Sequence, residues 1–287
     1  MLRKLIGSAV VLTSCLVTNL AVAQERDEFG YNPNSLRPIH SDDQLWRKTL
    51  WLRMDGKEKQ NKPFFAKNNE ISKVIIDAVK AGIIRPFAND SLVTRMSFET
   101  FVENLTIPGS EEGLSEEEKA MGFDSGGGDG WGDDGGGGAK EETAAATSNE
   151  FFAKDINILE IRLDLVFDKK RSRMYRDIQA ITMILPAEKN TAKGIDMPIA
   201  SFSYKELVEN VFKDNEGALW FNNANPKEHR NLSEAFDLTL YAAHLIKYQN
   251  SDDNYIADIY GPDKSFILAS MNLEYQLLDF EAEFWEY

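Results

Sequence analysis

One stretch of the chain, residues 109–149, constrains the possible folds more than any other. It holds 12 of the 19 glycines, and its eleven acidic residues face only Lys119 and Lys140. Such a segment has hardly any apolar side chain to bury, and ordering a glycine costs more backbone entropy than ordering any other residue. Repulsion between like charges extends it further. The sequence therefore predicts a disordered, acidic, Gly-rich linker over residues 109–149, with a folded part on each side.

Calcium binding is the alternative interpretation of this linker, because it carries four aspartates. An EF-hand needs its ligands at fixed positions of a 12-residue loop, and β-helix calcium sites need a repeated nonapeptide. Neither spacing fits the aspartates present, which are Asp124, Asp129, Asp133 and Asp134. The sequence therefore predicts no metal site.

Residues 1–23 have the pattern of a signal peptide. Arg3 and Lys4 precede an apolar run, and a small-residue site ends at Ala23, so cleavage is expected between Ala23 and Gln24. The sequence Leu-Thr-Ser-Cys ending at Cys15 also resembles a lipobox, but the apolar run continues beyond it. Ordinary cleavage after Ala23 is the preferred interpretation, with lipidation of Cys15 as the alternative.

Charge and cysteine content exclude several classes of function. The formal net charge is −15, which disfavours binding to nucleic acid or to anionic lipid surfaces. Cys15 is the only cysteine, so after cleavage neither a disulfide nor thiol chemistry is available. The chain is expected to be exported, without a membrane span of its own.

The first folded part, residues 24–108, is expected to be a small, mostly helical domain. Ser41 followed by two aspartates indicates a helix start, and the predicted helix runs to about Met54. Ile71, Val74, Ile75, Ala78 and Val79 repeat at helical spacing before Gly82, which suits a helix C-terminus. Ser97 caps a shorter helix that ends near Leu105.

The second folded part, residues 150–287, is expected to be an α+β domain. Alternating apolar residues over 156–167 and 174–184, joined by a turn at 168–171, predict a long antiparallel β-hairpin packed by helices. Helices are expected over 204–213, from Asn231 or Ser233 to about Tyr248, and from Ser265 onward. A short strand is expected over 255–260. The overall class is α+β.

Two kinds of residue are candidates for protein interfaces. Five cations crowd the hairpin turn of an otherwise acidic chain, and they suit either a solvated sheet edge or an anchor for an acidic surface. Aromatic residues near both ends of the mature chain either pack in the core or dock on a neighbour. The candidates are Lys169, Lys170, Arg171, Arg173, Arg176, Trp46, Trp51, Phe284, Trp285 and Tyr287.

Catalytic signatures are absent from the sequence. The three histidines lack the i, i+4 spacing of a zinc helix, and there is no nucleophile elbow, phosphate-binding loop or dinucleotide fingerprint. Asp164 and Asp237 stand in apolar surroundings, but both fit the outward face of a strand or helix. The sequence therefore favours a non-enzyme without cofactors; the alternative is a periplasmic carboxylate-based glycan hydrolase.

Several strings of residues resemble one known family. In the first part these are YNPNSLRPI (31–39), WRKTLW (46–51), EKQN (58–61), PFFA (63–66), EI (70–71) and NDSL (89–92). In the second part they are EIR (160–162), DIYG (258–261), ILA (267–269) and WEY (285–287). Together they resemble the GldN/PorN family of the type IX secretion and gliding machinery. The linker has no counterpart in the resemblance.

The resemblance implies a periplasmic scaffold protein rather than a catalyst. Its members would form a homo-oligomeric ring with an outer-membrane lipoprotein of the GldK/PorK type. The ring would also meet the periplasmic domain of a motor protein of the GldM/PorM type.

Overall fold

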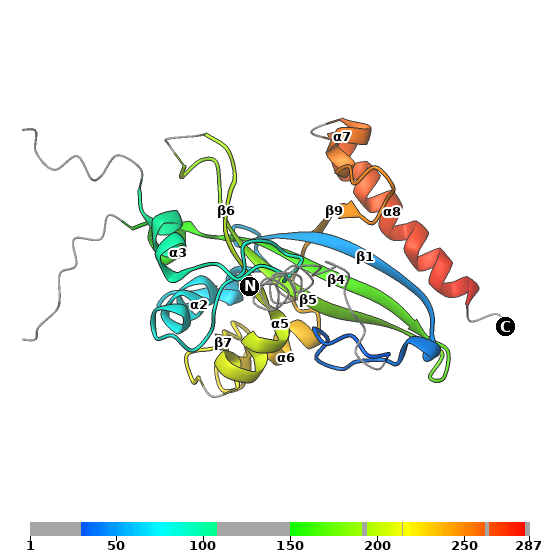
Figure 1. Ribbon diagram of the computed structural model, residues 1–287, viewed down its shortest axis with the longest axis horizontal. Coiled ribbons are helices and arrows are strands. Elements are labelled where there is room, and N and C mark those ends of the chain that lie inside the picture. The colour runs from blue at the N-terminus through cyan, green and yellow to red at the C-terminus, as the bar shows by residue number, and fades with distance from the viewer. Residues whose placement is uncertain (1–29, 108–149, 191–193, 214, 262–263, 285–287) are drawn as a thin grey trace, which may run out of the picture.

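The computed structural model describes residues 30–107, 150–190, 194–213, 215–261 and 264–284 (Figure 1). The expected signal peptide with Ala23 and Gln24, the expected linker, and the candidates Trp285 and Tyr287 lie outside the described residues. Within them, helices and a large antiparallel sheet confirm the α+β class.

The centre of the molecule is a five-stranded antiparallel sheet with the order β6-β5-β4-β1-β9. Its strands are β1 (Gln44–Asp55), β4 (Ile158–Asp168), β5 (Arg173–Leu185), β6 (Met197–Ser203) and β9 (His244–Tyr248). The short paired strands are β2 (Phe65–Ala66) with β3 (Asn69–Glu70) and β7 (Leu219–Trp220) with β8 (Arg230–Asn231).

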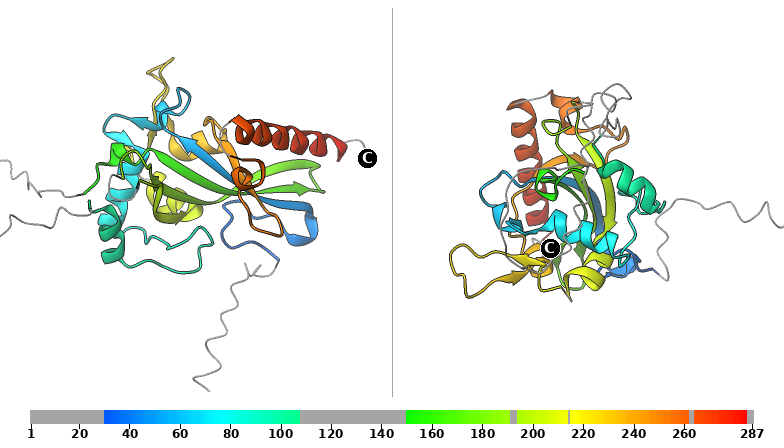
Figure 2. Two further views of the ribbon diagram at one scale, coloured as in Figure 1. Left: turned by 90° about the horizontal axis from the view of Figure 1, so that it is seen from above. Right: turned by 90° about the vertical axis from the view of Figure 1, so that its left-hand side faces the viewer.

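The predicted hairpin is confirmed as β4 and β5. Their register runs from Ile158 opposite Ile184 to Asp168 opposite Arg173. Alternation of side chains places Leu159, Ile161 and Leu163 on the face that packs against helices. Together with β1, the hairpin extends beyond β6 and β9 toward its turn (Figures 1 and 2).

The prediction of a helix over 41–54 is wrong, because most of this segment forms strand β1. The capping signal at Ser41 produces only one 3-10 turn, η1 (Ser41–Asp43), in which His40 accepts a hydrogen bond from the Asp42 N–H. Beyond it, Leu50, Leu52 and Met54 alternate on the core face, opposite Leu163, Ile161 and Leu159 of β4. Pairing with distant β4 and β9 overrides the local helix signal.

The other two helices expected before residue 108 are confirmed as α2 (Ile71–Lys80) and α3 (Phe98–Leu105). Gly82 has φ +72°, and the N–H groups of Gly82 and Ile83 donate to the carbonyls of Val79 and Ala78. These bonds form a Schellman C-cap, whose left-handed position favours glycine. Ser97 caps α3 by accepting a hydrogen bond from the Thr100 N–H.

After residue 200, the first and last predicted helices are confirmed, and the secondary structure predicted between them is partly wrong. The helix expected over 204–213 is α5 (Tyr204–Leu207) continued by the π-turn η4 (Val208–Phe212), and the last helix is α8 (Lys264–Glu283). The helix capped by Asn231 is α6, but it ends at Asp237, and β9 follows where the helix was expected to continue. The strand expected over 255–260 is a helix, α7 (Ile256–Tyr260).

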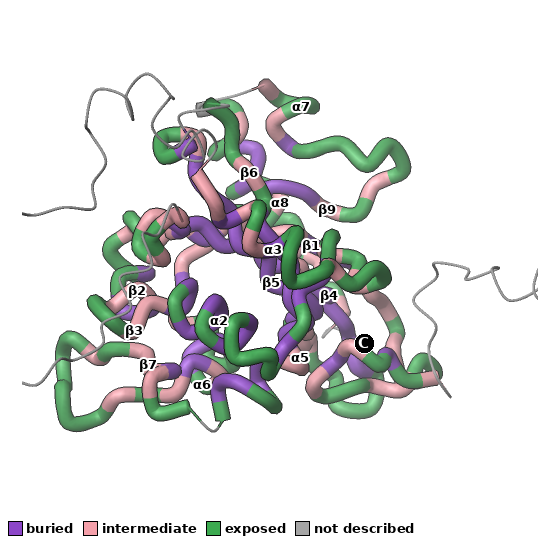
Figure 3. The backbone as a smooth tube through the Cα atoms, turned by 60° about the vertical axis from the view of Figure 1, so that its left-hand side comes forward, coloured by how far each residue is buried: buried purple, intermediate pink, exposed green. Residues whose placement is uncertain are grey.

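Residues from both sides of the expected linker share one sheet and one core. Strand β1 lies between β4 and β9, and the buried cluster includes Ile75 of α2 together with Ile181 of β5 and Phe236 of α6 (Figure 3). The Phe151 N–H donates to the Leu105 carbonyl, and Thr106 pairs with Glu150. The two ends of the described chain that flank the expected linker therefore lie side by side. The sequence predicted a separate core on each side of the linker, whereas the described residues share one core.

Candidate functional site

A groove of about 920 Å³ lies on the core face of the sheet, between α6 and α8. The long strands form its floor because they extend beyond the part of the sheet that α2, α5 and α6 cover (Figure 1). The floor side chains are aliphatic: Leu50 and Leu52 of β1, Leu163 and Leu165 of β4, Ile178 of β5 and Leu245 of β9. The volume suits a ligand or an inserted segment of another chain.

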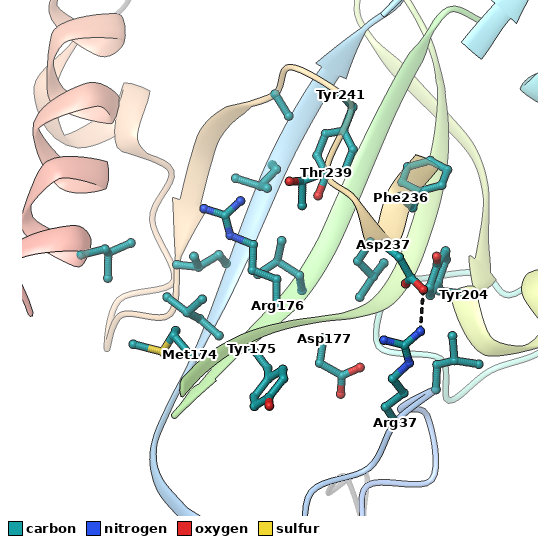
Figure 4. Close-up of a pocket in the computed structure, with 18 of the residues that line it drawn as sticks. Arg37, Met174, Tyr175, Arg176, Asp177, Tyr204, Phe236, Asp237, Thr239 and Tyr241 are labelled. Carbon is teal, nitrogen blue, oxygen red and sulfur yellow. Dashed lines mark hydrogen bonds and ion pairs between the residues drawn. The ribbon is translucent and has the colours of Figure 1, made fainter. Parts of the chain in front are cut away.

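Aromatic residues form one wall of the groove. The Phe236 ring at the end of α6 lies 5.8 Å from the Tyr204 ring and 5.5 Å from the Tyr241 ring, measured between centroids (Figure 4). Asn231 starts α6, the helix that carries Phe236, by accepting a hydrogen bond from the Ser233 N–H. The opposite wall is α8, with Leu277 and Leu278.

Charged side chains surround the opening of the groove. Arg37, from the segment before β1, donates to the carboxylate of Asp237 at 2.7 Å (Figure 4). Arg176 projects from β5 at the register position opposite Leu165, and it has no ion-pair partner among the described residues. Glu274 and Glu281 stand on α8 across the groove.

Asp177 is a groove carboxyl group whose acidity is perturbed by its surroundings. Burial, reinforced by the nearby charge of Asp164, raises the pKa of Asp177 to about 6. Its carboxylate accepts a hydrogen bond from the Gln179 side chain at 2.7 Å, and Gln179 in turn accepts one from Asn32. Asp177 therefore helps to hold the N-terminal segment against the edge of the sheet.

Replacing Asp177 by Asn is expected to change how stability depends on pH. The folded-state pKa lies above the ordinary value of about 3.9, so the stability that Asp177 contributes is fully present below about pH 4. It is lost as the pH rises through about 6. The Asn variant keeps an acceptor for Gln179 and should be more stable than the wild type by about 1–2 kcal/mol at pH 7, and equal to it below pH 4.

Denaturant unfolding between pH 4 and pH 8 measures this difference. The exposed acid Asp42, changed to Asn, serves as the control and should leave the pH profile unchanged. An Asp177→Asn profile parallel to that of the wild type would contradict the prediction.

The cations of the hairpin turn divide into two groups. Lys170 pairs with Asp43 at 2.7 Å, and Arg171 pairs with buried Asp168 at 2.7 Å. Although burial opposes it, hydrogen bonds from Arg171 and from the Lys170 N–H lower the pKa of Asp168. Lys169, Arg173 and Arg176 have no ion-pair partner among the described residues, so their charges are available to another molecule.

Trp46 and Phe284 come together in an aromatic cluster at the turn end of the sheet. The Phe284 ring stacks on Phe167 of β4 at 4.7 Å, and Phe280 of α8 lies 5.0 Å from Trp46. Phe280 and Phe284 are one helical turn apart, and their ring centroids lie 4.6 Å from each other. This cluster fastens the C-terminal end of α8 to the sheet.

Phe280→Ala is expected to loosen α8 without unfolding the sheet. Loss of the Trp46 contact should cost about 1–2 kcal/mol, because the Phe280 ring is only partly buried. Hydrogen exchange should become faster in residues 264–283 and stay unchanged in β4 and β5. Gln276→Ala, at an exposed position of the same helix, is the control; equal effects of the two changes would contradict the role of the cluster.

Trp51 lies on the opposite face of the sheet. Its Nε1–H donates to the Asp90 carboxylate at 2.6 Å, and the Lys247 ammonium lies 4.6 Å from the ring centroid. The polar edge of this tryptophan is therefore engaged within the chain, and it does not join Trp46.

The structure thus gathers only part of the predicted interface set. Arg171 and Arg176 reach the groove, and Trp46 and Phe284 share the aromatic cluster. Sequence reasoning missed the second, outward apolar face of α8, formed by Leu268, Met271, Tyr275 and Leu278. The spacing of three and four residues between these apolar positions could have indicated it.

The groove offers little for catalysis by carboxylates. Asp237 is paired with Arg37, and Asp177 is hydrogen-bonded to Gln179, so the hydrolase alternative gains no support from these two acids. No group of three or more His, Cys, Asp or Glu suited to a metal ion occurs in the described part of the chain. None of the described helices is long and apolar enough to cross a membrane.

Comparison with known proteins identifies the family. A family model described as "Gliding motility associated protein GldN" matches residues 39–286, a range that includes β1, the hairpin and α8. No curated protein matches the chain. Because the family model covers most of the sequence, the chain belongs to the GldN family of gliding motility associated proteins.

Proposed function

We propose that this protein is a structural subunit of a periplasmic ring in the type IX secretion and gliding machinery. The observation that carries the proposal is the family match, because it spans both the hairpin and α8. The described surface supports it: unpaired cations project from the hairpin, and an exposed apolar face runs along α8. Exposed apolar patches of this kind mark contacts with other proteins.

The partners in this proposal are further copies of the chain, an outer-membrane lipoprotein of the GldK/PorK type and the periplasmic domain of a GldM/PorM-type motor protein. The lipoprotein would hold the ring at the outer membrane, so the chain needs no membrane span of its own. The ring would act as a scaffold that transmits force, and no bond would be made or broken on it.

The expected linker has a place in this proposal. Thr106 and Glu150, which flank it in the described chain, pair with each other. The acidic charge of the linker would favour a basic site on a neighbouring subunit, and a tethered segment has a raised effective concentration for such a site.

Cross-linking mass spectrometry on the native cell envelope tests the proposed function. The expected result is a large particle in which this protein is linked both to further copies of itself and to a lipoprotein. Links should involve the hairpin, α8 or the groove rim, and Glu99 and Glu103 on α3 serve as reference positions. A protein recovered only as a monomer, without lipoprotein links, would overturn the proposal.

A further inference from the structure

Helix α8 has two apolar faces, and only one of them packs on the sheet. Ala269, Leu273, Leu277 and Phe280 face inward and belong to the core or pack against it. On the outward side, the exposed fractions are 61% for Leu268, 44% for Met271 and 59% for Tyr275, and Leu278, at 54%, stands at the border between this side and the groove. Intervals of three, four and three residues form the continuous stripe by which one helix packs on another structure.

The outward stripe is continuous with other exposed apolar residues. Ile267 lies beside Leu268 on α8, and Ile259 and Tyr260 of the neighbouring helix α7 are about half exposed. Single exposed apolar residues are ordinary, but a row along nearly three helical turns indicates a contact surface.

The charges beside this stripe exclude one occupant and favour another. Glu274, Asp279 and Glu283 are exposed and have no ion pair among the described residues, and residues 265–283 contain no lysine or arginine. Two α8 helices packed face to face would bring like charges together. The face therefore suits an apolar surface that carries cations.

The turn end of the hairpin has that chemistry. Lys169, Arg173 and Arg176 lack ion-pair partners in the described structure, and Leu45 of β1, at 57% exposed, lies beside the turn. The Lys169 N–H donates to the Asp43 carbonyl, which holds the turn next to the start of β1. The chain thus presents an acidic apolar surface on α8 and a basic apolar surface at the hairpin end. Figure 1 shows where α8 and the hairpin lie.

We infer that the outward face of α8 in one copy binds the hairpin end of the next copy. A contact that uses the α8 surface of one copy and the hairpin end of the next is head-to-tail, and head-to-tail contacts generate rings when the rotation between subunits closes. Tyr275 forms its apolar centre opposite Leu45, with Leu278 beside it at the groove border. Glu274, also at the groove border, and Asp279 meet Lys169 and Arg173. The inference rests on the proposed function, because it names the contact that would join copies within the ring.

A charge exchange between two variants of the full-length mature chain tests this contact. The first variant is Glu274→Lys with Asp279→Lys, and the second is Lys169→Glu with Arg173→Glu. Each variant alone should self-associate at least tenfold more weakly than the wild type, because like charges face each other in every contact. An equimolar mixture should regain assembly, since each altered surface then meets an opposite charge.

Light scattering and sedimentation velocity measure the mass distribution, and unchanged circular dichroism shows that each variant is folded. Glu99→Lys with Glu103→Lys on α3 is the matched control, with the same change of charge on another helix. A disulfide between Leu45→Cys of one copy and Leu278→Cys of another should form readily, whereas Val93→Cys in place of Leu45→Cys should not give one.

Three results would overturn the inference: a wild-type chain that stays monomeric, variants that assemble alone as well as the wild type, or a mixture that does not recover. If the envelope complex with the lipoprotein forms normally in the exchanged variants, this contact is wrong and the proposed function stands. If the wild type forms no such complex, the proposed function itself fails.

Discussion

A fragment of residues 150–287 alone is expected to show no cooperative unfolding transition. Without the preceding residues it loses β1, so one edge of β4 has no hydrogen-bonding partner and β9 has no neighbour in the sheet. It also loses α2, whose Ile71 and Ile75 are fully buried in the shared core. The loss of a central strand and of a core helix exceeds the few kcal/mol that stabilise an ordinary domain.

Thermal unfolding followed by circular dichroism measures this result. The control is co-production of residues 24–108 with residues 150–287, which should restore a complex with a single transition, because β1 can pair between β4 and β9 from a separate chain. A fragment 150–287 that folds alone would show that each side of the expected linker is an independent domain, as the sequence predicted.

The elements predicted correctly are those whose signals are local. The hairpin follows from alternation on both sides of a four-residue turn, and α2 follows from five apolar residues at helical spacing with Gly82 at its end. Ser97 was identified correctly as a helix cap, and Asn231 was one of two candidates for the cap of α6, because an N-cap needs only its own side chain and the next turn.

The elements predicted wrongly depend on partners far along the chain. Strand β1 carries a helix-start signal at Ser41, and only β4, more than 100 residues later, decides that it is a strand. Strand β9 likewise exists because it pairs with β1. The wrong assignment of β1 also led to the expectation of two cores, since a helical segment would not have joined the later sheet.

The candidate site was predictable in its charges and not in its shape. The cations at 169–176 stand out in an acidic sequence, and Arg171 and Arg176 do reach the groove. The groove itself needs β1 as a strand of the sheet and α6 on the core face of that sheet. No local sequence pattern specifies either placement. Asp164, expected on an outward face, is instead covered, with an exposed fraction of 1%.

Replacing Arg47 by Met is expected to lower the free energy of unfolding by about 2–4 kcal/mol. Asp164 is almost completely buried; its Oδ1 accepts a hydrogen bond from Thr49 at 2.7 Å, and its Oδ2 lies 2.9 Å from the Arg47 guanidinium. Without that guanidinium, a buried carboxylate keeps its desolvation cost and loses its closest counter-charge. In a domain of this size the midpoint of thermal unfolding should fall by roughly 5–15 °C.

A second substitution separates this cause from simple loss of packing. Arg47→Met combined with Asp164→Asn removes the uncompensated charge and keeps an acceptor for Thr49, so most of the lost stability should return. Lys57→Met, which breaks an exposed ion pair with Glu188, should cause no measurable change. If the double variant is no more stable than Arg47→Met, the loss comes from the aliphatic stem of Arg47, and the buried charge is stabilised by its remaining hydrogen bonds.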